Sequence, residues 1–298
     1  MIKNTFSIKD LENLSGVKAH TIRIWEKRYE LLQPSRSDTN IRYYDLHHLQ
    51  KILNVSYLRR VGFKISSIAS LTSEEIELKV RKIAQEEHHA NVDLQELKLA
   101  MVNFDELLFN KVYHKVLKEN DFAEVFNRLF IPFLEELGSL WQSNTINIAH
   151  EHFITNLIRQ KLLVQADGMK RENTIPKKNV FVLFLPENEM HDLGLLFLNY
   201  KLLASGHRTI FLGASMQLET LPFFQRNEQK PIFVTYITVQ PTLKKLPKFL
   251  EKFNKKLNHA PLMLLGYRTI DIDKNILTPN QKVFNSIKNC IEYFEELK

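Results

Sequence analysis

The spacing of hydrophobic residues changes twice along the 298-residue chain, and each change predicts a different kind of structure. Up to about residue 72, short apolar stretches alternate with turn formers, a pattern typical of small helices and a short strand. From Ser73 the apolar positions recur at helical spacing for about ninety residues with few breakers. Beyond residue 178, continuous apolar runs typical of buried strands alternate with helical segments.

These patterns predict a multidomain α plus α/β protein. We expect a winged helix-turn-helix over residues 1–74, a helical bundle over 75–170, and a doubly wound, Rossmann-like parallel sheet over 175–298. The last helix of the bundle is expected from about Asn147 to Leu163, and the last helix of the chain near 281–297. The strands of the sheet are expected at 180–185, 209–212, 232–239 and 262–265.

The first two predicted helices have the arrangement of a helix-turn-helix. Ser7, a good N-cap residue, precedes a short amphipathic helix that Ser15-Gly16 ends. A second helix is expected over residues 18–29, and in this arrangement the second helix enters the major groove of DNA. The polar residues on its outer face are candidates for DNA contact: Lys18, His20, Thr21, Arg23, Lys27 and Arg28.

A basic hairpin is expected directly after this helix. Turn formers fill residues 34–40, and the next four residues alternate as in a short strand. A basic hairpin beside a recognition helix is a wing. We expect Arg36, Arg42 and Tyr43 to reach phosphates there, which fixes the register on the duplex without reading its sequence.

The sequence RIWEKRYELLQPSRSDTNIRYY (residues 23–44), followed by LRRVGFKISSI (residues 58–68), resembles the DNA-binding domain of MerR-type transcription regulators. Many members of this family have a tyrosine at the position of Trp25. A tryptophan here resembles the branch of the family that carries a cobalamin-binding effector domain. The resemblance implies double-stranded DNA with an inverted-repeat operator as partner, and a homo-oligomer, either a dimer or a tetramer. The alternative is a small helical domain with an ordinary solvated basic face.

Composition narrows the class of protein. The net charge of +7 is divided into +6 over residues 1–72, −5 over 73–170 and +6 over the remainder, so charge alone does not locate a DNA-binding domain. Cys290 is the only cysteine, which excludes an intramolecular disulfide. Neither a signal peptide nor an apolar run of spanning length is visible, and we expect a cytoplasmic protein without a membrane partner.

The loop after the first strand is the first place to look for a ligand, because ligands bind beyond the carboxyl ends of strands in such sheets. His191 in this loop is a candidate metal ligand, and either Glu189 or Asp192 is available to accept its other N–H. Gly194 would let a planar ligand or a second backbone come close. No Gly-x-Gly-x-x-Gly follows the strand and no Walker loop is present, so a dinucleotide is not expected.

The spacing of Glu189, His191 and Gly194 resembles the cobalamin-binding pattern of an acidic residue, one spacer, His, two spacers and Gly. In that family the histidine is the lower axial ligand to cobalt, which implies this role for His191. The alternative is an ordinary surface-loop histidine at a helix N-terminus.

A second motif lies in the predicted bundle. Trp141, nine intervening residues and then Glu151-His152 resemble the signature of the helical cap over the upper face of cobalamin. The alternative is a core tryptophan beside a solvated helix start. Light-sensing members can have a histidine directly after the tryptophan, whereas this chain has Gln142.

Two later segments depart from the family pattern. The family supplies a small hydroxyl residue and then a Gly-Gly pair that make room for the nucleotide tail. Here the third strand contains Thr235-Tyr236-Ile237-Thr238, and the fourth is followed by Gly266 and then Tyr267, whose ring is expected to obstruct the tail. Thr238 and Gly266 are therefore the candidate residues at these positions.

The sequence thus predicts a sequence-specific transcription regulator, a repressor and not an enzyme, whose C-terminal module senses adenosylcobalamin or methylcobalamin. One alternative is a regulator with a degenerate cobalamin-type domain that responds to a protein antagonist or another ligand. A further alternative is a cobalamin-dependent methyltransferase-like protein, although no catalytic partner domain is visible. No a/d heptads persist past Ser73, so we expect oligomerisation through the effector module.

Overall fold

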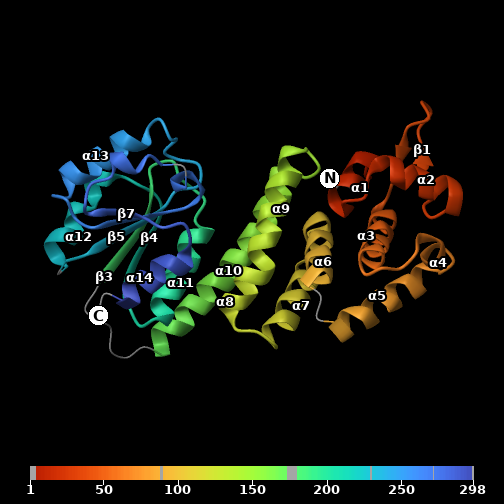
Figure 1. Cartoon of the computed structure of the whole chain (residues 1–298), viewed down its shortest axis with the longest axis horizontal. Coiled ribbons are helices and arrows are strands. Elements are labelled where there is room, and N and C mark those ends of the chain that lie inside the picture. The colour runs from red at the N-terminus through yellow and green to blue at the C-terminus, as the bar shows by residue number, and fades with distance from the viewer. Residues whose placement is uncertain (1–4, 88–89, 173–179, 229, 271, 297–298) are drawn as a thin grey trace. The chain divides into compact units, whose positions relative to one another are not determined.

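The computed structural model describes residues 5–87, 90–172, 180–228, 230–270 and 272–296. The chain divides into two compact units, Met1–Leu157 and Ile158–Lys298, called here the N-terminal unit and the C-terminal unit (Figure 1). The division falls inside one long helix, α10 (Ile148–Glu172). In the described parts of the chain, none of the helices combines the length and the apolar character needed to cross a bilayer.

The N-terminal unit begins with the expected helix-turn-helix. Ser7 caps α1 (Ile8–Ser15): its hydroxyl accepts a hydrogen bond from the N–H of Asp10, and the Asp10 carboxylate accepts one from the N–H of Ser7. Gly16 adopts the left-handed conformation (φ 74°) that ends this helix. α2 (Ala19–Tyr29) follows and begins one residue later than expected, because Lys18 occupies the N-cap position.

The wing is formed by two short strands, as expected. β1 (Ser35–Arg36) and β2 (Arg42–Tyr43) pair antiparallel, with Arg36 opposite Arg42. α3 (Leu46–Arg60) and α4 (Ile65–Ala69) complete a small domain, which we call the reader head (α1 to α4).

A helical bundle follows the reader head, as expected. It ends in α10, which continues to Glu172 rather than to Leu163, since residues 164–172 contain no proline and only one glycine to stop it. The other helices are α5 (Ser73–Glu87), α6 (Ala90–Asn103), α7 (Glu106–Leu117), α8 (Phe122–Val125), a π-helical turn (Phe126–Phe130) and α9 (Ile131–Gln142).

The C-terminal unit contains a parallel sheet with the strand order β4-β3-β5-β6-β7. Its strands are β3 (Val180–Pro186), β4 (Arg208–Met216), β5 (Ile232–Tyr236), β6 (Leu262–Leu265) and β7 (Gln281–Val283). Its helices are α11 (Leu193–Ala204), α12 (Pro222–Asn227), α13 (Leu246–Lys256) and α14 (Ile287–Glu296).

The prediction of a single helix over residues 281–297 was wrong. Residues 281–283 add a fifth strand beside β6, and α14 begins only at Ile287. The strand consists of Gln-Lys-Val, which lacks the apolar run that marked the other strands.

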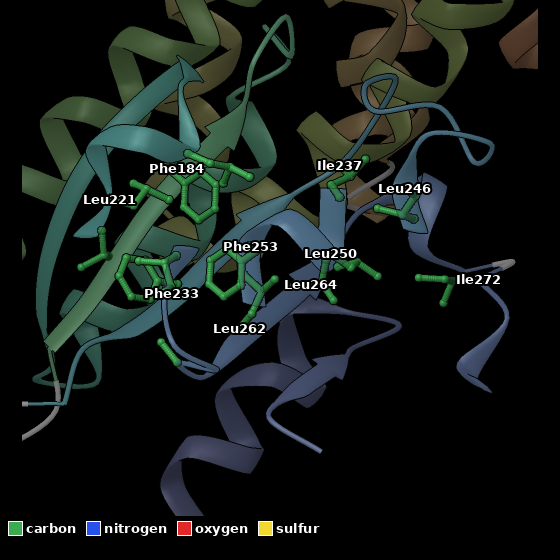
Figure 2. Packing of buried hydrophobic residues seen from close by; sticks show 14 residues of the cluster. Phe184, Leu221, Phe233, Ile237, Leu246, Leu250, Phe253, Leu262, Leu264 and Ile272 are labelled. Atoms are coloured by element: carbon green, nitrogen blue, oxygen red, sulfur yellow. The ribbon is translucent and has the colours of Figure 1, made fainter. Parts of the chain in front are cut away.

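Two hydrophobic clusters cover the two faces of the sheet, and β3 contributes alternate residues to each. Val182 and Phe184 pack in a cluster with Leu250 and Phe253 of α13, shown in Figure 2. The residues between them on β3 pack with α11 and α14 on the opposite face. A strand buried on both faces explains the continuous apolar run in this part of the sequence.

Candidate functional site

The outer face of α2 displays the side chains expected to touch DNA. His20, Arg23 and Lys27 are exposed and lie three to four residues apart, so they share one face of the helix. This face also carries the exposed Ile24. The predicted contacts are all exposed or half-buried, and DNA contact by each stays a prediction: Lys18, His20, Thr21, Arg23, Lys27 and Arg28.

Glu26, which the sequence analysis missed, connects the recognition helix to the wing. Its carboxylate is 9% exposed and accepts hydrogen bonds from Nε of Arg42 (3.2 Å) and from Oη of Tyr44 (2.5 Å). Burial raises the pKa of Tyr44, and the hydrogen bond to Glu26 raises it further. Arg42 is thus braced against α2, whereas Arg36 and Tyr43 are exposed on the hairpin.

In the C-terminal unit the strand order reverses between β3 and β5, which is where ligands bind in doubly wound sheets. Glu189, fully buried in the loop after β3, joins the two strand ends. One of its carboxylate oxygens accepts hydrogen bonds from the backbone N–H groups of Thr238, Val239 and Gln240 at 3.1, 2.6 and 2.7 Å. The other accepts from the backbone of Met190 and His191 and from the His191 ring.

This carboxylate selects the tautomer of His191. Burial alone would raise the pKa of Glu189, but hydrogen bonds from His191, Val239 and Gln240 outweigh it and lower the pKa to about 2. Because Glu189 is ionised at neutral pH, Nδ1 of His191, 2.6 Å away, is the nitrogen that carries the proton and donates it. In the neutral ring the lone pair therefore lies on Nε2, and the His191 side chain is 56% exposed.

Asp192, which the sequence offered as an alternative acceptor for the ring N–H of His191, has a different partner. The structure assigns the His191 N–H to Glu189, while Asp192 pairs with Arg159 of α10. Nη2 of Arg159 lies 2.7 Å from Oδ1 of Asp192, and Nε lies 3.2 Å from both carboxylate oxygens. Arg159 is 33 residues away in sequence, and no local pattern pointed to it.

The planar group that lies against Gly194 is the ring of Tyr236 at the end of β5. A Cβ atom at Gly194 would come within 2.9 Å of three carbons of this ring, so only glycine fits beneath it. Any other group that approached Gly194 would have to displace the ring. A role of Gly194 in cofactor binding therefore stays a prediction.

Thr238 and Gly266, the two candidate positions later in the chain, lie at the ends of β5 and β6. Thr238 contributes its backbone N–H to Glu189. Gly266 has φ 105°, and a Cβ atom there would come within 2.8 Å of three backbone atoms of Ile237, so β6 ends in close contact with the end of β5. Tyr267 is 70% exposed, and the obstruction of a nucleotide tail by its ring stays a prediction.

Trp141, Glu151 and His152 lie in the N-terminal unit around the turn between α9 and α10. Trp141 is 55% exposed, which excludes the alternative of a core tryptophan. Glu151 and His152 follow in the first turn of α10, with Oε2 and Nδ1 3.5 Å apart. A hollow of about 700 Å³ at this turn is lined by Trp141, Gln142, Asn144, Thr145, Ile146, Asn147, Ile148 and His150.

In the C-terminal unit, His191 and Glu189 fit a cofactor that takes one nitrogen ligand from the protein. His191 offers a half-exposed imidazole of fixed tautomer, held by a carboxylate that is itself anchored. Glu189 is therefore the hydrogen-bonded carboxylate partner that metal-binding histidines commonly have.

Comparisons with known protein families identify both parts of the predicted regulator. Residues 6–75 match the profile described as MerR HTH family regulatory protein. Residues 93–164 match the profile described as B12 binding domain, a range that includes Trp141, Glu151 and His152. The predicted MerR-type DNA-binding domain and the predicted cobalamin binding are thus confirmed, and the second match lies in the helical bundle, not in the sheet expected over residues 175–298.

Related proteins agree with this assignment. The chain is 28% identical over 229 residues to the HTH-type transcriptional repressor CarH of Myxococcus xanthus. This match covers 74% of this chain and 75% of that protein. It is 27% identical over 214 residues to the HTH-type transcriptional repressor CarA of the same organism, with 70% and 68% covered. The solved monomethylamine corrinoid protein of Methanosarcina barkeri has a similar fold, with a TM-score of 0.57, 14% identity, and coverage of 70% of this chain and 100% of that one.

Proposed function

We propose that this chain, a MerR-type transcription regulator with a cobalamin-binding effector module, is a repressor that binds cobalamin through Nε2 of His191. The observation that supports this role is the fixed tautomer of His191. A buried, ionised carboxylate keeps the proton on Nδ1 of a half-exposed ring. When bound, cobalamin would supply a cobalt ion that can take a nitrogen ligand from the protein. The repressor activity is inferred from the relatives CarH and CarA.

In this proposal Glu189 orients and tunes the ligand. It accepts the Nδ1 proton and so raises the basicity of Nε2, as carboxylate partners of metal-bound histidines do. Its second oxygen is held by three consecutive backbone N–H groups after β5, so the carboxylate is fixed before any cofactor arrives. Asp192, Gly194 and Gly266 support the same end of the sheet.

We propose that Trp141, Glu151 and His152 also contribute to cofactor binding. An exposed indole ring beside a hollow offers a flat apolar surface for stacking, and two polar side chains follow in the next helix. Adenosylcobalamin and methylcobalamin are the forms to compare.

We further propose that the protein binds an inverted-repeat operator as a dimer or tetramer, because one recognition helix and one wing cover only a half-site. Its effector module acts as a sensor rather than as an enzyme.

A second candidate function is a regulator that answers to a protein antagonist. The Tyr236 ring against Gly194 favours this reading, because it fills the space that a glycine at this position would leave open for a cofactor. Corrinoid binding distinguishes the two candidates.

The test is retention of corrinoid by the full-length protein. The protein is incubated in the dark with adenosylcobalamin or methylcobalamin and desalted, and its absorption spectrum is recorded beside those of His191→Ala and a control, His259→Asn, which changes an exposed histidine elsewhere in the C-terminal unit. We expect the wild type and the control to retain a corrinoid spectrum with a nitrogen axial ligand, and His191→Ala to lose it. If all three proteins emerge colourless, cobalamin binding through His191 is rejected. This result would support the second candidate, a regulator that answers to a protein antagonist.

A further inference from the structure

His191 stands between two carboxylates, and each of them is anchored to a different part of the C-terminal unit. Glu189, two residues before it, is bound by the backbone after β5. Asp192, directly after it, is bound by Arg159 of α10. The backbone of the candidate ligand is thus held from both sides.

The Arg159–Asp192 pair has the geometry of a specific contact. Three N···O distances of 2.7 to 3.2 Å join the guanidinium to both carboxylate oxygens. The two side chains are 34% and 17% exposed, so the pair is partly shielded from solvent. Bidentate pairs of this kind fix orientation as well as distance.

Asp192 does not use its carboxylate in the usual way for its position. It is the N-cap residue of α11, where an aspartate commonly accepts a hydrogen bond from the backbone of the first helical turn. Its side chain makes no such bond here and instead faces Arg159. The helix start therefore does not explain the pairing.

We infer that Arg159 is a positioning residue for His191: through Asp192 it holds the histidine loop against α10, so that Nε2 is presented at a fixed place. This inference rests on the proposed function of His191 as the corrinoid ligand. Arg159 also lies two helical turns after His152 on α10.

The test uses adenosylcobinamide, a corrinoid without the nucleotide base, in the dark with the full-length protein. Its absorption reports an imidazole supplied by the protein, with no competition from the cofactor's own base. The variants are Arg159→Ala, Arg159→Lys, Asp192→Asn and His191→Ala. Arg208→Ala is the matched control, because Arg208 makes a bidentate pair with Glu228 at the other end of β4.

We expect Arg159→Ala and Asp192→Asn to weaken corrinoid binding about 10- to 100-fold, as loss of the groups that orient a metal ligand commonly does. The corrinoid that still binds should show a smaller fraction of imidazole ligation, a spectral change that a purely structural role would not produce. The corrinoid affinity and imidazole ligation of Arg159→Lys should fall between those of these variants and the wild type. Arg208→Ala should match the wild type in both. Thermal unfolding shows which variants fold. If Arg159→Ala does not fold, the nearly isosteric Asp192→Asn provides the test of the inference.

Two results would overturn the inference, and they can be told apart. If the wild type ligates cobinamide through His191 but Arg159→Ala and Asp192→Asn behave like Arg208→Ala, Arg159 has no positioning role and the proposed function stands. If the wild type gives no imidazole spectrum at all, the proposed function fails and the inference fails with it.

Discussion

At the scale of single residues, Glu189 is the side chain on which the candidate cofactor site depends most. Its buried carboxylate accepts hydrogen bonds from the backbone N–H groups of Met190, His191, Thr238, Val239 and Gln240, and from the His191 ring. Hydrogen bonds to a charged group are stronger than those between neutral groups, and losing the charge would leave several donors poorly satisfied.

We predict that Glu189 makes the stability of the C-terminal unit depend on pH in the acid range. Its pKa is lowered from 4.5 to about 2 in the folded protein. Since the folded-state pKa is the lower one, its stabilisation is fully present above pH 4.5 and is lost as the pH falls through about 2. The difference corresponds to about 3 kcal/mol of unfolding free energy.

Urea unfolding followed between pH 7 and pH 2.5 measures this dependence in the wild type and in Glu189→Gln. The variant should be less stable at pH 7 and should lose less stability on acidification. Glu187→Gln is the control, because Glu187 is exposed in the same loop. Parallel pH profiles for the wild type and Glu189→Gln would show that the carboxylate is not held as described.

At the scale of elements, the recognition helix and the wing behave as one piece because Glu26 of α2 binds both Arg42 and Tyr44. We predict that Arg42→Ala weakens binding to all duplexes alike and flattens the dependence of log K on log salt by about one unit, as the loss of one phosphate contact does. Fluorescence anisotropy with a random-sequence duplex at several salt concentrations measures both effects.

Glu26→Gln provides the comparison for this prediction. It removes the charged brace of the wing and keeps Arg42, so the affinity should fall while the salt slope is retained. An unchanged slope in Arg42→Ala would assign Arg42 to the brace alone and remove it from the phosphate contacts.

The elements that the sequence predicted well are those whose pattern is local. The capping box of α1, the turn at Gly16 and the doubly buried strand β3 all have signals within a few residues. β7 was missed because a short strand with polar residues has no such signal. The backbone partners of Glu189 after β5 and the partner of Asp192 could not be predicted, because they lie 49 to 51 and 33 residues away and only the folded C-terminal unit brings them together.

At the scale of the whole molecule, the two units share one continuous helix. α10 starts in the N-terminal unit with Glu151 and His152 and carries Arg159 in the C-terminal unit. Within the N-terminal unit, Nδ2 of Asn13 in α1 donates a hydrogen bond to Oγ1 of Thr145 (2.8 Å), in the turn that follows Trp141. The reader head therefore contacts the turn that holds part of the predicted cofactor site.

These connections lead us to expect that corrinoid binding changes DNA binding. Coupling between two sites of a regulator commonly alters affinity by about 5- to 150-fold. The change must depend on His191, since that residue is proposed to bind the cofactor.

The most direct measurement is the affinity of the full-length protein for an operator selected from random DNA, taken in the dark with and without adenosylcobalamin, for the wild type and His191→Ala. We predict a shift of about 5- to 150-fold for the wild type and none for the variant, with equal affinities of the two proteins in the absence of cofactor. Identical wild-type affinities with and without adenosylcobalamin would contradict the account of this protein as a cobalamin-sensing repressor.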